Sequence, residues 1–440
     1  MADVCVIGTG TVGLVSAACF ASLGKKVIAV DKDVGKIGRL RDGKLPIYEP
    51  DLEELVHKTI NVGTLKLTTS VSEGVSSSEI IFICVGTPAS DDGRADMSQV
   101  EAVSREVAES MTDYRVVVEK STVPVQTSQW VERTMRLYNR ERIDFDVASN
   151  PEFLREGSAV HDFFNPDRIV IGASSERARE KISSLYNGFN CPVIATDVNT
   201  AELIKHAANS FLALKVSFIN LVSELCERTG ADVTVVADAI GSDSRIGRKF
   251  LDAGIGYGGS CFPKDLAAFV RTADELQIDF NLLKEVEKIN SRRIEICMDK
   301  LHKTLWVLRD KQITILGLSF KPDTDDIRGA PAIVLIERLL AEGTSLRLCD
   351  PKANAAVKEL YPESQQIKYF LDPYEAAIGS HALTVVTEWN DFIKLDWGRI
   401  KDLMLTPIIV DGRNILDPDS MSAIGFEYHS FGRPHRLAEG

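Results

Sequence analysis

The chain has few aromatic residues, no net positive charge, no paired cysteines and no long apolar run. Its formal net charge is -13 and aromatic residues make up 7% of the total. A deficit of Lys and Arg argues against a protein that binds a nucleic-acid backbone over a broad surface. The N-terminal apolar stretch is soon broken by glycines, so we expect neither a signal peptide nor a transmembrane helix there.

The eight cysteines are scattered, without a C-x-x-C pair or a Cys/His cluster. This pattern excludes the usual structural zinc sites, and we expect no metal. Cysteines inside apolar runs, such as Cys5 and Cys84, are typical of core thiols in a reducing compartment. The sequence therefore predicts a cytoplasmic protein.

With 440 residues, the chain is too long for one ordinary core. Its N-terminal part alternates strand and helix patterns. A short apolar strand at 3–7 precedes a glycine-rich turn, a helical pattern at 12–23 and a second strand at 26–30. Further strand patterns lie at 80–85, 115–118 and 145–148. This alternation predicts a doubly wound parallel sheet over roughly residues 1–195.

The remaining chain divides into a helical middle and a second α/β region. Apolar residues at helical spacing over 199–229 predict a long helix, capped by Asn199 or Thr200 and stopped at Gly230. From 312 a strand–helix–strand pattern echoes the N-terminus without its three glycines. We predict an α/β protein with two Rossmann-like doubly wound domains, joined by a long central helix and a helical middle domain. The predicted boundaries are 1–198 for the first Rossmann-like domain, 199–305 for the central helix and helical middle domain, and 306–440 for the second Rossmann-like domain. Without the three glycines, the second Rossmann-like domain would bind something other than a dinucleotide.

The glycine-rich turn carries the G-x-G-x-x-G pattern of dinucleotide-binding proteins. Its glycines are Gly8, Gly10 and Gly13, and it lies between a predicted strand and a predicted helix. Asp31 ends the second strand, where it can accept a hydrogen bond from a ribose hydroxyl. A carboxylate there favours NAD over NADP, although the nearby Lys36 weakens that preference. The alternative is an ordinary turn.

A second glycine-rich stretch, 254–259, is followed closely by Cys261. Such glycines allow the backbone to pass close to a ligand. A thiol needs access and nearby positive charge to act as a nucleophile, and Lys264 could supply the charge. A thiol beside an NAD site can capture an aldehyde as a thiohemiacetal, which then gives up hydride to form a thioester. The alternative is that Cys261 is a small buried apolar residue.

Weaker candidates each have an ordinary alternative. Glu152 and Glu156 follow a strand, where α/β sites form, but solvated surface explains them equally well. Lys205 and Asn209 share one helix face, although a surface lysine is the simpler interpretation of Lys205. Lys321 could meet a phosphate or belong to a polar turn.

Together these motifs resemble the UDP-glucose/GDP-mannose dehydrogenase family of nucleotide-sugar 6-dehydrogenases over nearly the whole chain. The matching motifs are the fingerprint, Lys120-Ser121-Thr122-Val123-Pro124, Asn150-Pro151-Glu152-Phe153-Leu154, Asn165-Pro166-Asp167-Arg168, Ala201-Glu202-Leu203 with Lys205 and Asn209, Gly258-Gly259-Ser260-Cys261-Phe262, Phe320-Lys321-Pro322-Asp323-Thr324, Thr387-Glu388-Trp389 and Asp411-Gly412-Arg413.

The resemblance implies a four-electron oxidation of a sugar C6 from alcohol to carboxylate with two NAD⁺. By position, Cys261 would be the nucleophile. Lys205 would stabilise the developing oxyanion, with Asn209 as a further donor. Asp265 would orient a water molecule and Lys205. Glu152 would serve as base. Thr122 would hold the water.

The resemblance also implies binding residues and an assembly. Cofactor contacts are expected from Gly8, Gly10, Thr11, Val12, Gly13, Asp31, Lys36, Thr87, Thr122, Glu156, Lys264 and Arg328. Nucleotide-sugar contacts are expected from Glu152, Phe153, Leu154, Lys205, Asn209, Arg245, Phe250, Tyr257, Gly258, Phe262, Lys321 and Arg413. Arg245 would reach the substrate of a neighbouring subunit. By the same resemblance, residues 1–198 would be the NAD-binding domain, 199–305 the dimerisation domain and 306–440 the UDP-sugar-binding domain. The long central helix would form a dimer interface, so we expect a homodimer or a larger homo-oligomer.

The flanks of Cys261 and the stretch 165–172 favour UDP-glucose as substrate, and GDP-mannose is the alternative within the family. Outside it, a two-electron hydroxy-acid dehydrogenase would need no cysteine. A catalytically silent NAD-binding protein would reduce no NAD. No nucleic-acid or membrane partner is expected.

Overall fold

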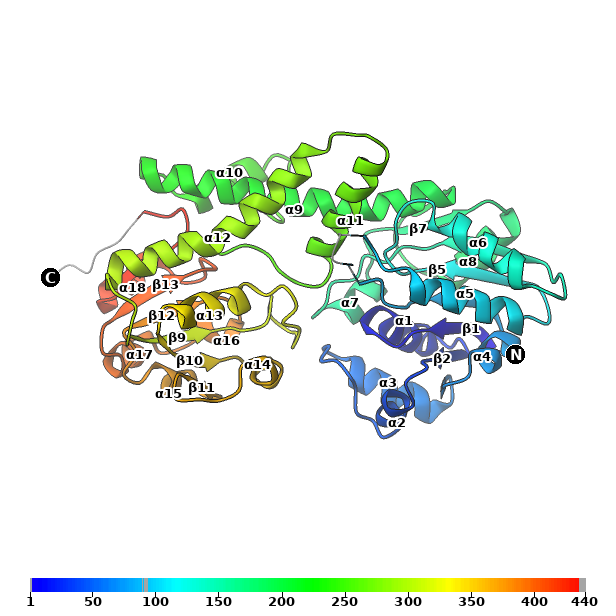
Figure 1. Ribbon diagram of the computed structural model, residues 1–440, viewed down its shortest axis with the longest axis horizontal. Coiled ribbons are helices and arrows are strands. Elements are labelled where there is room, and N and C mark those ends of the chain that lie inside the picture. The colour runs from blue at the N-terminus through cyan, green and yellow to red at the C-terminus, as the bar shows by residue number, and fades with distance from the viewer. Residues whose placement is uncertain (1, 89, 91–93, 435–440) are drawn as a thin grey trace. The chain divides into compact units, whose positions relative to one another are not determined.

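The computed structural model describes residues 2–88, 90 and 94–434 as two compact units (Figure 1). One unit comprises residues 1–208 and 264–278, and the other comprises 209–263 and 279–440. Over these described residues, none of the helices combines the length and the apolar character that crossing a membrane requires.

The first unit is built on an eight-stranded sheet in the order β3-β2-β1-β4-β5-β6-β7-β8. Its strands are β1 (Ala2–Ile7), β2 (Val27–Val30), β3 (Leu65–Thr68), β4 (Ser78–Ile83), β5 (Arg115–Glu119), β6 (Phe145–Ser149), β7 (Ile169–Ala173) and β8 (Val193–Thr196). The strands predicted at 3–7, 26–30, 80–85, 115–118 and 145–148 are confirmed within one or two residues. One feature differs from the prediction, because β6 and β7 pair antiparallel.

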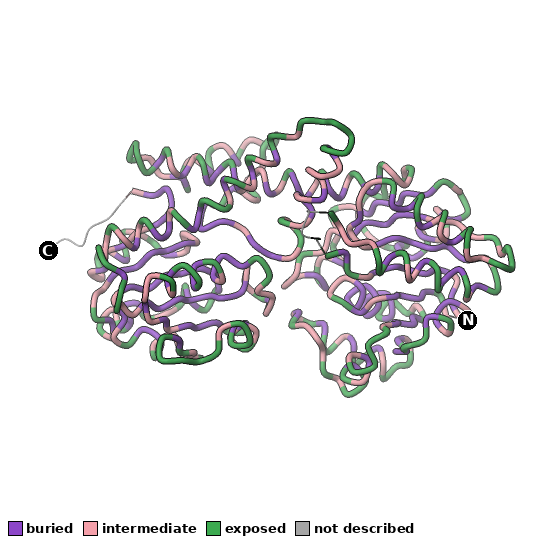
Figure 2. Tube along the Cα trace, viewed as in Figure 1, coloured by how far each residue is buried: buried purple, intermediate pink, exposed green. Residues whose placement is uncertain are grey.

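Helices cover both faces of this sheet. They are α1 (Thr11–Ser22), α2 (Val34–Arg41), α3 (Leu52–Val62), α4 (Val71–Ser77), α5 (Ser98–Ser110), α6 (Thr127–Tyr138), α7 (Ala159–Phe164) and α8 (Glu176–Leu185). Alternate strand residues explain the two layers: Val116 and Val118 of β5 join the core under α1, whereas Val117 joins the core under α5 and α6. Figure 2 shows the strands as mostly buried. The predicted doubly wound architecture is therefore confirmed.

A long helix, α9 (Val198–Thr229), follows the sheet. It ends at Gly230, whose φ of 75° is left-handed, as predicted. The predicted cap was wrong: Asp197, not Asn199 or Thr200, accepts the backbone N–H of Thr200 at 2.9 Å. The aspartate is the last residue before the helix, so its carboxylate meets the first unbonded N–H groups.

The second unit contains a six-stranded parallel sheet in the order β11-β10-β9-β12-β13-β14. The strands are β9 (Gln312–Leu316), β10 (Ser345–Cys349), β11 (Ile367–Phe370), β12 (Ala382–Val385), β13 (Ile408–Asp411) and β14 (Glu427–His429). This is the Rossmann strand order, so the predicted echo of the N-terminal architecture is confirmed.

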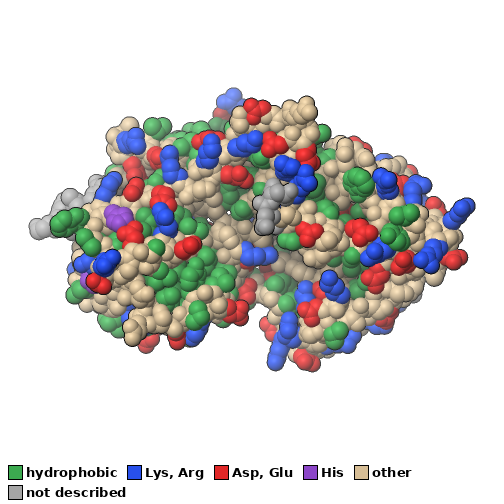
Figure 3. Space-filling view, viewed as in Figure 1, with side chains coloured by type: hydrophobic (Ala, Val, Ile, Leu, Met, Phe, Trp, Pro, Cys, Tyr) green, Lys and Arg blue, Asp and Glu red, His purple; other side chains and the backbone are tan. Residues whose placement is uncertain are grey.

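The remaining helices belong to the second unit, except α11, most of which falls in the first unit. They are α10 (Val233–Gly241), α11 (Phe262–Glu275), α12 (Asn281–Leu305), α13 (Pro331–Ala341), α14 (Asn354–Leu360), α15 (Pro373–Ala377), α16 (Asn390–Ile393), α17 (Trp397–Leu403) and α18 (Pro418–Ile424). Side chains of α12 and α13 pack on one face of the sheet, and those of α16, α17 and α18 pack on the other. On the visible surface, acidic and basic side chains are interspersed (Figure 3).

Candidate active site

The three fingerprint glycines lack a side chain for different reasons. Gly8 has a φ of 102°, and a Cβ there would lie 2.4 Å from the carbonyl oxygen of Cys84. A Cβ on Gly13 would lie 1.9 Å from the carbonyl oxygen of Gly8. These two glycines therefore serve the turn and the packing of α1 against it.

Gly10 is different, because a Cβ there would meet no described protein atom within 4 Å. Its φ of -73° and ψ of -171° are also accessible to any residue. Among the described residues, neither a close protein contact nor the backbone conformation explains why position 10, at the N-terminus of α1, is a glycine. That helix end has no side-chain cap and no acidic residue in its first turn, so its N–H groups suit an anion such as a pyrophosphate.

Asp31 lies at the end of β2, beside the glycine turn. Its Oδ2 accepts hydrogen bonds from the backbone N–H and the hydroxyl of Thr9, at 3.0 and 2.8 Å, and from Lys36 Nζ at 2.7 Å. Burial by itself raises the pKa of Asp31, but the bonds from Lys36 and Thr9 outweigh it and lower that pKa to about 2. The residue is therefore a carboxylate at neutral pH, anchored to the fingerprint loop.

Glu152 and Lys205 form an ion pair of 2.9 Å between Oε1 and Nζ, and their side chains are only 5 and 6% exposed. The interpretation of both residues as solvated surface was wrong, because they meet across 53 residues of sequence. The second oxygen of Glu152 accepts the backbone N–H of Leu154 at 2.5 Å. Two cations lie near the ring of Phe153, Arg168 at 3.8 Å and Lys205 at 5.5 Å from its centre.

Lys120 is a second buried lysine close to this pair. Its Nζ donates to the backbone carbonyl and to the side-chain oxygen of Asn150, at 3.3 and 3.1 Å. Asn150 also accepts from the Tyr186 hydroxyl and donates to Val170 O, which fixes the turn that carries Glu152. Burial lowers the pKa of Lys120. Lys120 belongs to a motif that is visible in the sequence, but no local pattern indicates that its side chain is buried.

Thr122 and Thr87 adjoin the first turn of α11. The Thr87 hydroxyl donates to the carbonyl of Thr122 at 2.9 Å and accepts from Lys264 Nζ at 3.2 Å. Lys264 also pairs with the fully buried Asp265 at 3.1 Å. Thr87 thus contacts two other predicted site residues of the same unit, one 35 and the other 177 positions away in sequence.

Cys261 is exposed, whereas Cys191 is partly buried and the other six cysteines are buried. Burial raises the pKa of Cys84, Cys297 and Cys349 to about 12, which makes those thiols unreactive. Cys261 immediately precedes α11. Backbone N–H groups at a helix start stabilise an adjacent anion.

The glycines before Cys261 pack closely against other protein segments. A Cβ on Gly254 would lie 2.4 Å from Gly412 O, and one on Gly258 would lie 2.2 Å from Gly329 O. At Gly259 it would lie 2.8 Å from the ring of Phe320. The loop is glycine-rich because it threads between other loops of its unit.

Side chains hold this loop in place. Asn290 accepts from the backbone N–H of Tyr257 and donates to its carbonyl, both at 2.9 Å. Arg413 donates to the carbonyls of Gly256 and Val386, at 2.7 and 2.6 Å. The rings of Phe250 and Tyr257 both lie near that of Phe262, at 6.2 and 5.6 Å.

The other predicted residues are less enclosed. Arg245 is 86% exposed and pairs with Asp243. Arg328 is exposed and pairs with Asp326, and Lys321 lies 5.5 Å from the ring of Phe320. Glu156 is partly buried. Their cofactor and substrate contacts stay predictions.

Asp350 is the counterpart of Asp31 in the second unit. Its Oδ2 accepts the N–H groups of Leu318 and Ser319 at 2.7 and 3.1 Å, and the indole N–H of Trp389 at 3.1 Å. It is almost fully buried. Protein donors bond to both carboxylates, but Asp350 is almost fully buried whereas the side chain of Asp31 is 13% exposed. Asp350 is therefore less accessible to a ribose than Asp31 is.

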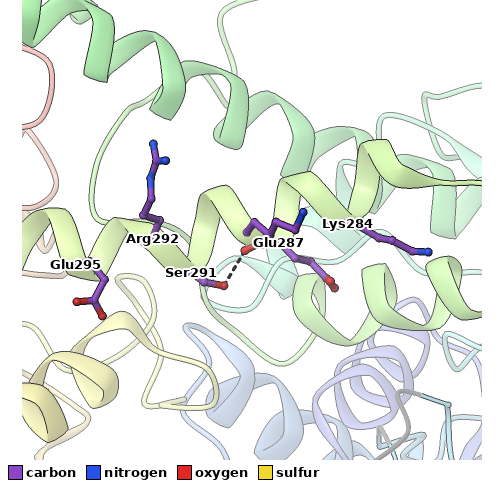
Figure 4. Close-up of a pocket in the computed structure, with 6 residues that line it drawn as sticks. Lys284, Glu287, Ser291, Arg292 and Glu295 are labelled. Atoms are coloured by element: carbon purple, nitrogen blue, oxygen red, sulfur yellow. Dashed lines mark hydrogen bonds between the residues drawn. The ribbon is translucent and has the colours of Figure 1, made fainter.

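A shallow pocket lies along α12 and is lined by Lys284, Glu287, Lys288, Ser291, Arg292 and Glu295 (Figure 4). All six residues share one face of a single helix, and none belongs to the predicted site. We assign this pocket no catalytic role.

The structure thus groups the predicted residues by unit. The first unit holds Gly8, Gly10, Thr11, Val12, Gly13, Asp31, Lys36, Thr87, Thr122, Glu152, Phe153, Leu154, Glu156, Lys205, Lys264 and Asp265. The second holds Asn209, Arg245, Phe250, Tyr257, Gly258, Cys261, Phe262, Lys321, Arg328 and Arg413. Lys205 and Asn209 lie one turn apart on α9.

Three family models match consecutive parts of the chain. They describe the NAD binding domain (residues 2–190), the central domain (199–292) and the UDP binding domain (314–418) of the UDP-glucose/GDP-mannose dehydrogenase family. The NAD binding domain coincides with the sheet that carries the fingerprint.

Known proteins are similar over nearly the full length. UDP-glucose 6-dehydrogenase TuaD of Bacillus subtilis is 44% identical, covering 99% of this chain and 94% of that protein. A UDP-glucose 6-dehydrogenase of Pseudomonas aeruginosa is also 44% identical, covering 98% and 97%. A solved UDP-glucose dehydrogenase from Pyrobaculum islandicum superposes with a TM-score of 0.89 at 39% identity, covering 94% and 95%. The chain therefore belongs to the UDP-glucose/GDP-mannose dehydrogenase family.

Proposed function

We propose that the protein oxidises UDP-glucose at C6 to UDP-glucuronate, using two NAD⁺ and one water. Full-length similarity to UDP-glucose 6-dehydrogenases supports the substrate. The observation that carries the chemistry is the single exposed cysteine, Cys261, which directly precedes helix α11.

The fingerprint fits NAD. The open backbone at Gly10 and the uncapped start of α1 suit the pyrophosphate, and the Asp31 carboxylate suits a ribose hydroxyl. When bound, NAD⁺ supplies the hydride acceptor for both oxidations. We propose the remaining cofactor contacts for Thr11, Val12, Gly13, Lys36, Thr87, Thr122, Glu156, Lys264 and Arg328.

The chain's own groups divide the rest of the chemistry. Cys261 Sγ would bond to C6 at the aldehyde level and release it as a carboxylate when water displaces the thiol. The ammonium of Lys205 would stabilise the negative charge on the C6 oxygen, which is most effective in a dry site. Glu152 would accept the proton of the water, and Thr122 and Asp265 would orient that water.

The nucleotide-sugar would be bound by Phe153, Leu154, Asn209, Arg245, Phe250, Tyr257, Gly258, Phe262, Lys321 and Arg413. The Rossmann-like sheet of the second unit matches a UDP binding domain. Asp350 is almost fully buried, whereas the side chain of Asp31 is 13% exposed, which supports a ligand other than a dinucleotide there.

We also propose that the protein forms a homodimer through α9. Phe211, Phe218 and Leu225 are exposed at seven-residue intervals, and Leu221 lies between the last two. This is the spacing of a helix–helix seam. The eight free cysteines support a reducing, cytoplasmic setting.

The decisive experiment measures NADH formed per UDP-glucose consumed, for the parent and for Cys261→Ser. We expect two NADH per sugar, and no sustained turnover in the variant. Cys191→Ser removes a partly buried thiol and is the matched control; it should turn over like the parent.

Three results would require revision. One NADH per sugar, or an active Cys261→Ser, would indicate a two-electron dehydrogenase. Two NADH from GDP-mannose but none from UDP-glucose would keep the mechanism and change the substrate. NAD binding without NADH from either sugar would indicate a silent binding protein.

A further inference from the structure

The loop that carries Thr122 is held by side chains from several elements. Ser121 N donates to Glu119 Oε1 at 2.9 Å, and Thr122 O accepts from Thr87 at 2.9 Å. Val123 O lies 2.7 Å from His206 Nε2. Hydrogen bonds therefore hold Thr122 at its own carbonyl and at the residues directly before and after it.

Glu202 of α9 makes the largest number of these loop contacts. Its Oε2 accepts the backbone N–H of Gln126 at 2.6 Å, and its Oε1 accepts the backbone N–H and the hydroxyl of Ser128 at 2.8 and 2.6 Å. Glu202 is 3% exposed. The side chain of Gln126 itself provides no cap for α6, so the carboxylate of Glu202, which lies 76 residues after Gln126, takes that place.

Gln126 has a φ of 77°, which is left-handed backbone. A non-glycine residue rarely adopts this conformation, and it persists where surrounding contacts hold it. The bond from Gln126 N to Glu202 is such a contact. The shape of the loop from Thr122 to Gln126 thus depends on α9.

The same turn of α9 carries Lys205. Glu202 lies three residues before Lys205, and His206 directly follows it. Glu202 and His206 both bind the Thr122 loop, whereas Lys205 binds Glu152. One helical turn therefore sets the position of the loop relative to the buried ion pair.

We propose that Glu202 is a positioning residue that keeps Thr122 at a fixed distance and orientation relative to Lys205 during the oxidation. This inference rests on the proposed function, which gives Thr122 the water and Lys205 the oxyanion. In this proposal Glu202 itself contacts neither the water nor the oxyanion.

The first test is Glu202→Gln. Glutamine keeps one acceptor oxygen but places an NH₂ group against a backbone N–H, because its nitrogen cannot accept. We expect kcat to fall about 10- to 100-fold, as for a reacting group misplaced by about an ångström. KM for UDP-glucose should stay within about two-fold, because remote substrate contacts persist. The matched control is Glu180→Gln on the exposed face of α8, which should leave kcat unchanged.

A double-variant cycle separates positioning from a general loss of structure. If Glu202 acts through Thr122, Glu202→Gln should lower kcat much less in a Thr122→Val background than in the parent. Losses that multiply would overturn the proposal. So would a normal kcat in Glu202→Gln, or a normal kcat in Thr122→Val beside a slow Glu202→Gln.

Ser128→Ala provides the test if Glu202→Gln fails to fold, since it removes only one of the three donors to the carboxylate. A smaller fall in kcat that again vanishes in the Thr122→Val background supports the proposal, and an unchanged kcat opposes it. Failure of the proposed function itself is visible separately, because the parent would then form no NADH from UDP-glucose.

Discussion

Glu152 and Lys205 come from different structural elements and form a buried ion pair of 2.9 Å. Glu152 lies on the turn after β6. The hydrogen bonds of Lys120 to Asn150 hold this turn in place. Lys205 lies on α9, which Glu202 fixes to the loop after β5. Different residues thus hold the two charged side chains in place. If one of them were removed, the other would remain buried without a partner of opposite charge.

Lys205→Met should cost both stability and activity. Breaking a buried pair typically costs about 3–5 kcal/mol because one charge is left without its partner. Removal of a donor to a developing oxyanion typically costs about 100- to 1000-fold in kcat. Denaturant unfolding and initial rates measure the two effects.

The double variant Lys205→Met with Glu152→Gln separates these effects. It removes both charges, so most of the lost stability should return while the rate stays low. Recovery of the rate together with stability would show that Lys205 is structural only.

Gly10→Ala should lower the affinity for NAD, whereas Gly13→Ala should lower the stability of the fold. A methyl group at Gly10 meets no described protein atom, so the thermal midpoint should stay near that of the parent while NAD affinity falls. A methyl group at Gly13 would lie 1.9 Å from Gly8 O, so that variant should be strongly destabilised even without NAD. Thermal unfolding and calorimetric titration with NAD test both. Normal NAD affinity in Gly10→Ala would contradict the pyrophosphate assignment.

Asp31→Ala should shift cofactor preference toward NADP. Its carboxylate repels a 2′-phosphate, and its loss leaves Lys36 Nζ without its 2.7 Å partner. We expect the NAD/NADP ratio of kcat/KM to fall by about ten-fold or more, or about 1.4 kcal/mol. Because the pKa of Asp31 is lowered to about 2, its carboxylate should stay ionised between pH 8 and 5, and the parent's affinity for NAD, which has no 2′-phosphate, should not change through Asp31 over this range. A loss of NAD affinity over this range that is absent from Asp31→Ala would contradict the ionised carboxylate.

Glu119 should make stability depend on pH. Burial raises its pKa to about 8, although Ser121 donates to it. The folded protein therefore keeps a proton that the unfolded chain loses above about pH 4.3. This contribution is complete below that pH and is lost as pH rises to about 8.

Glu119→Gln tests this directly, because the amide does not ionise. The stability of the parent relative to the variant should fall as pH rises from about 5 to 8. Urea unfolding across this range measures it, with Glu106→Gln on the exposed side of α5 as control. A constant difference between parent and variant would contradict the raised pKa.

Phe218→Glu should weaken self-association, because it places a charge in the middle of the exposed α9 stripe. Sedimentation should show a smaller species than the parent. Leu137→Glu, on the exposed side of α6, is the control and should leave the mass unchanged. A parent that is already monomeric would contradict the proposed dimer.

The sequence by itself determined the elements and the cofactor fingerprint, because these depend on local patterns. The strand 345–349 and the end of α9 at Gly230 follow from apolar spacing and from a left-handed glycine. The roles of Gly8 and Gly13 follow from a motif whose geometry is local. The family also follows from motifs that lie along one chain.

Tertiary structure decided which polar residues are buried and what the second glycine loop does. Lys205 and Glu152 lie 53 residues apart, so no local pattern distinguishes them from surface charges. The glycines at 254–259 serve close packing against Gly412, Gly329 and Phe320, which no sequence spacing reveals. Glu202 caps α6 across 74 residues for the same reason: the carboxylate and its donors meet only when the sheet and α9 pack together.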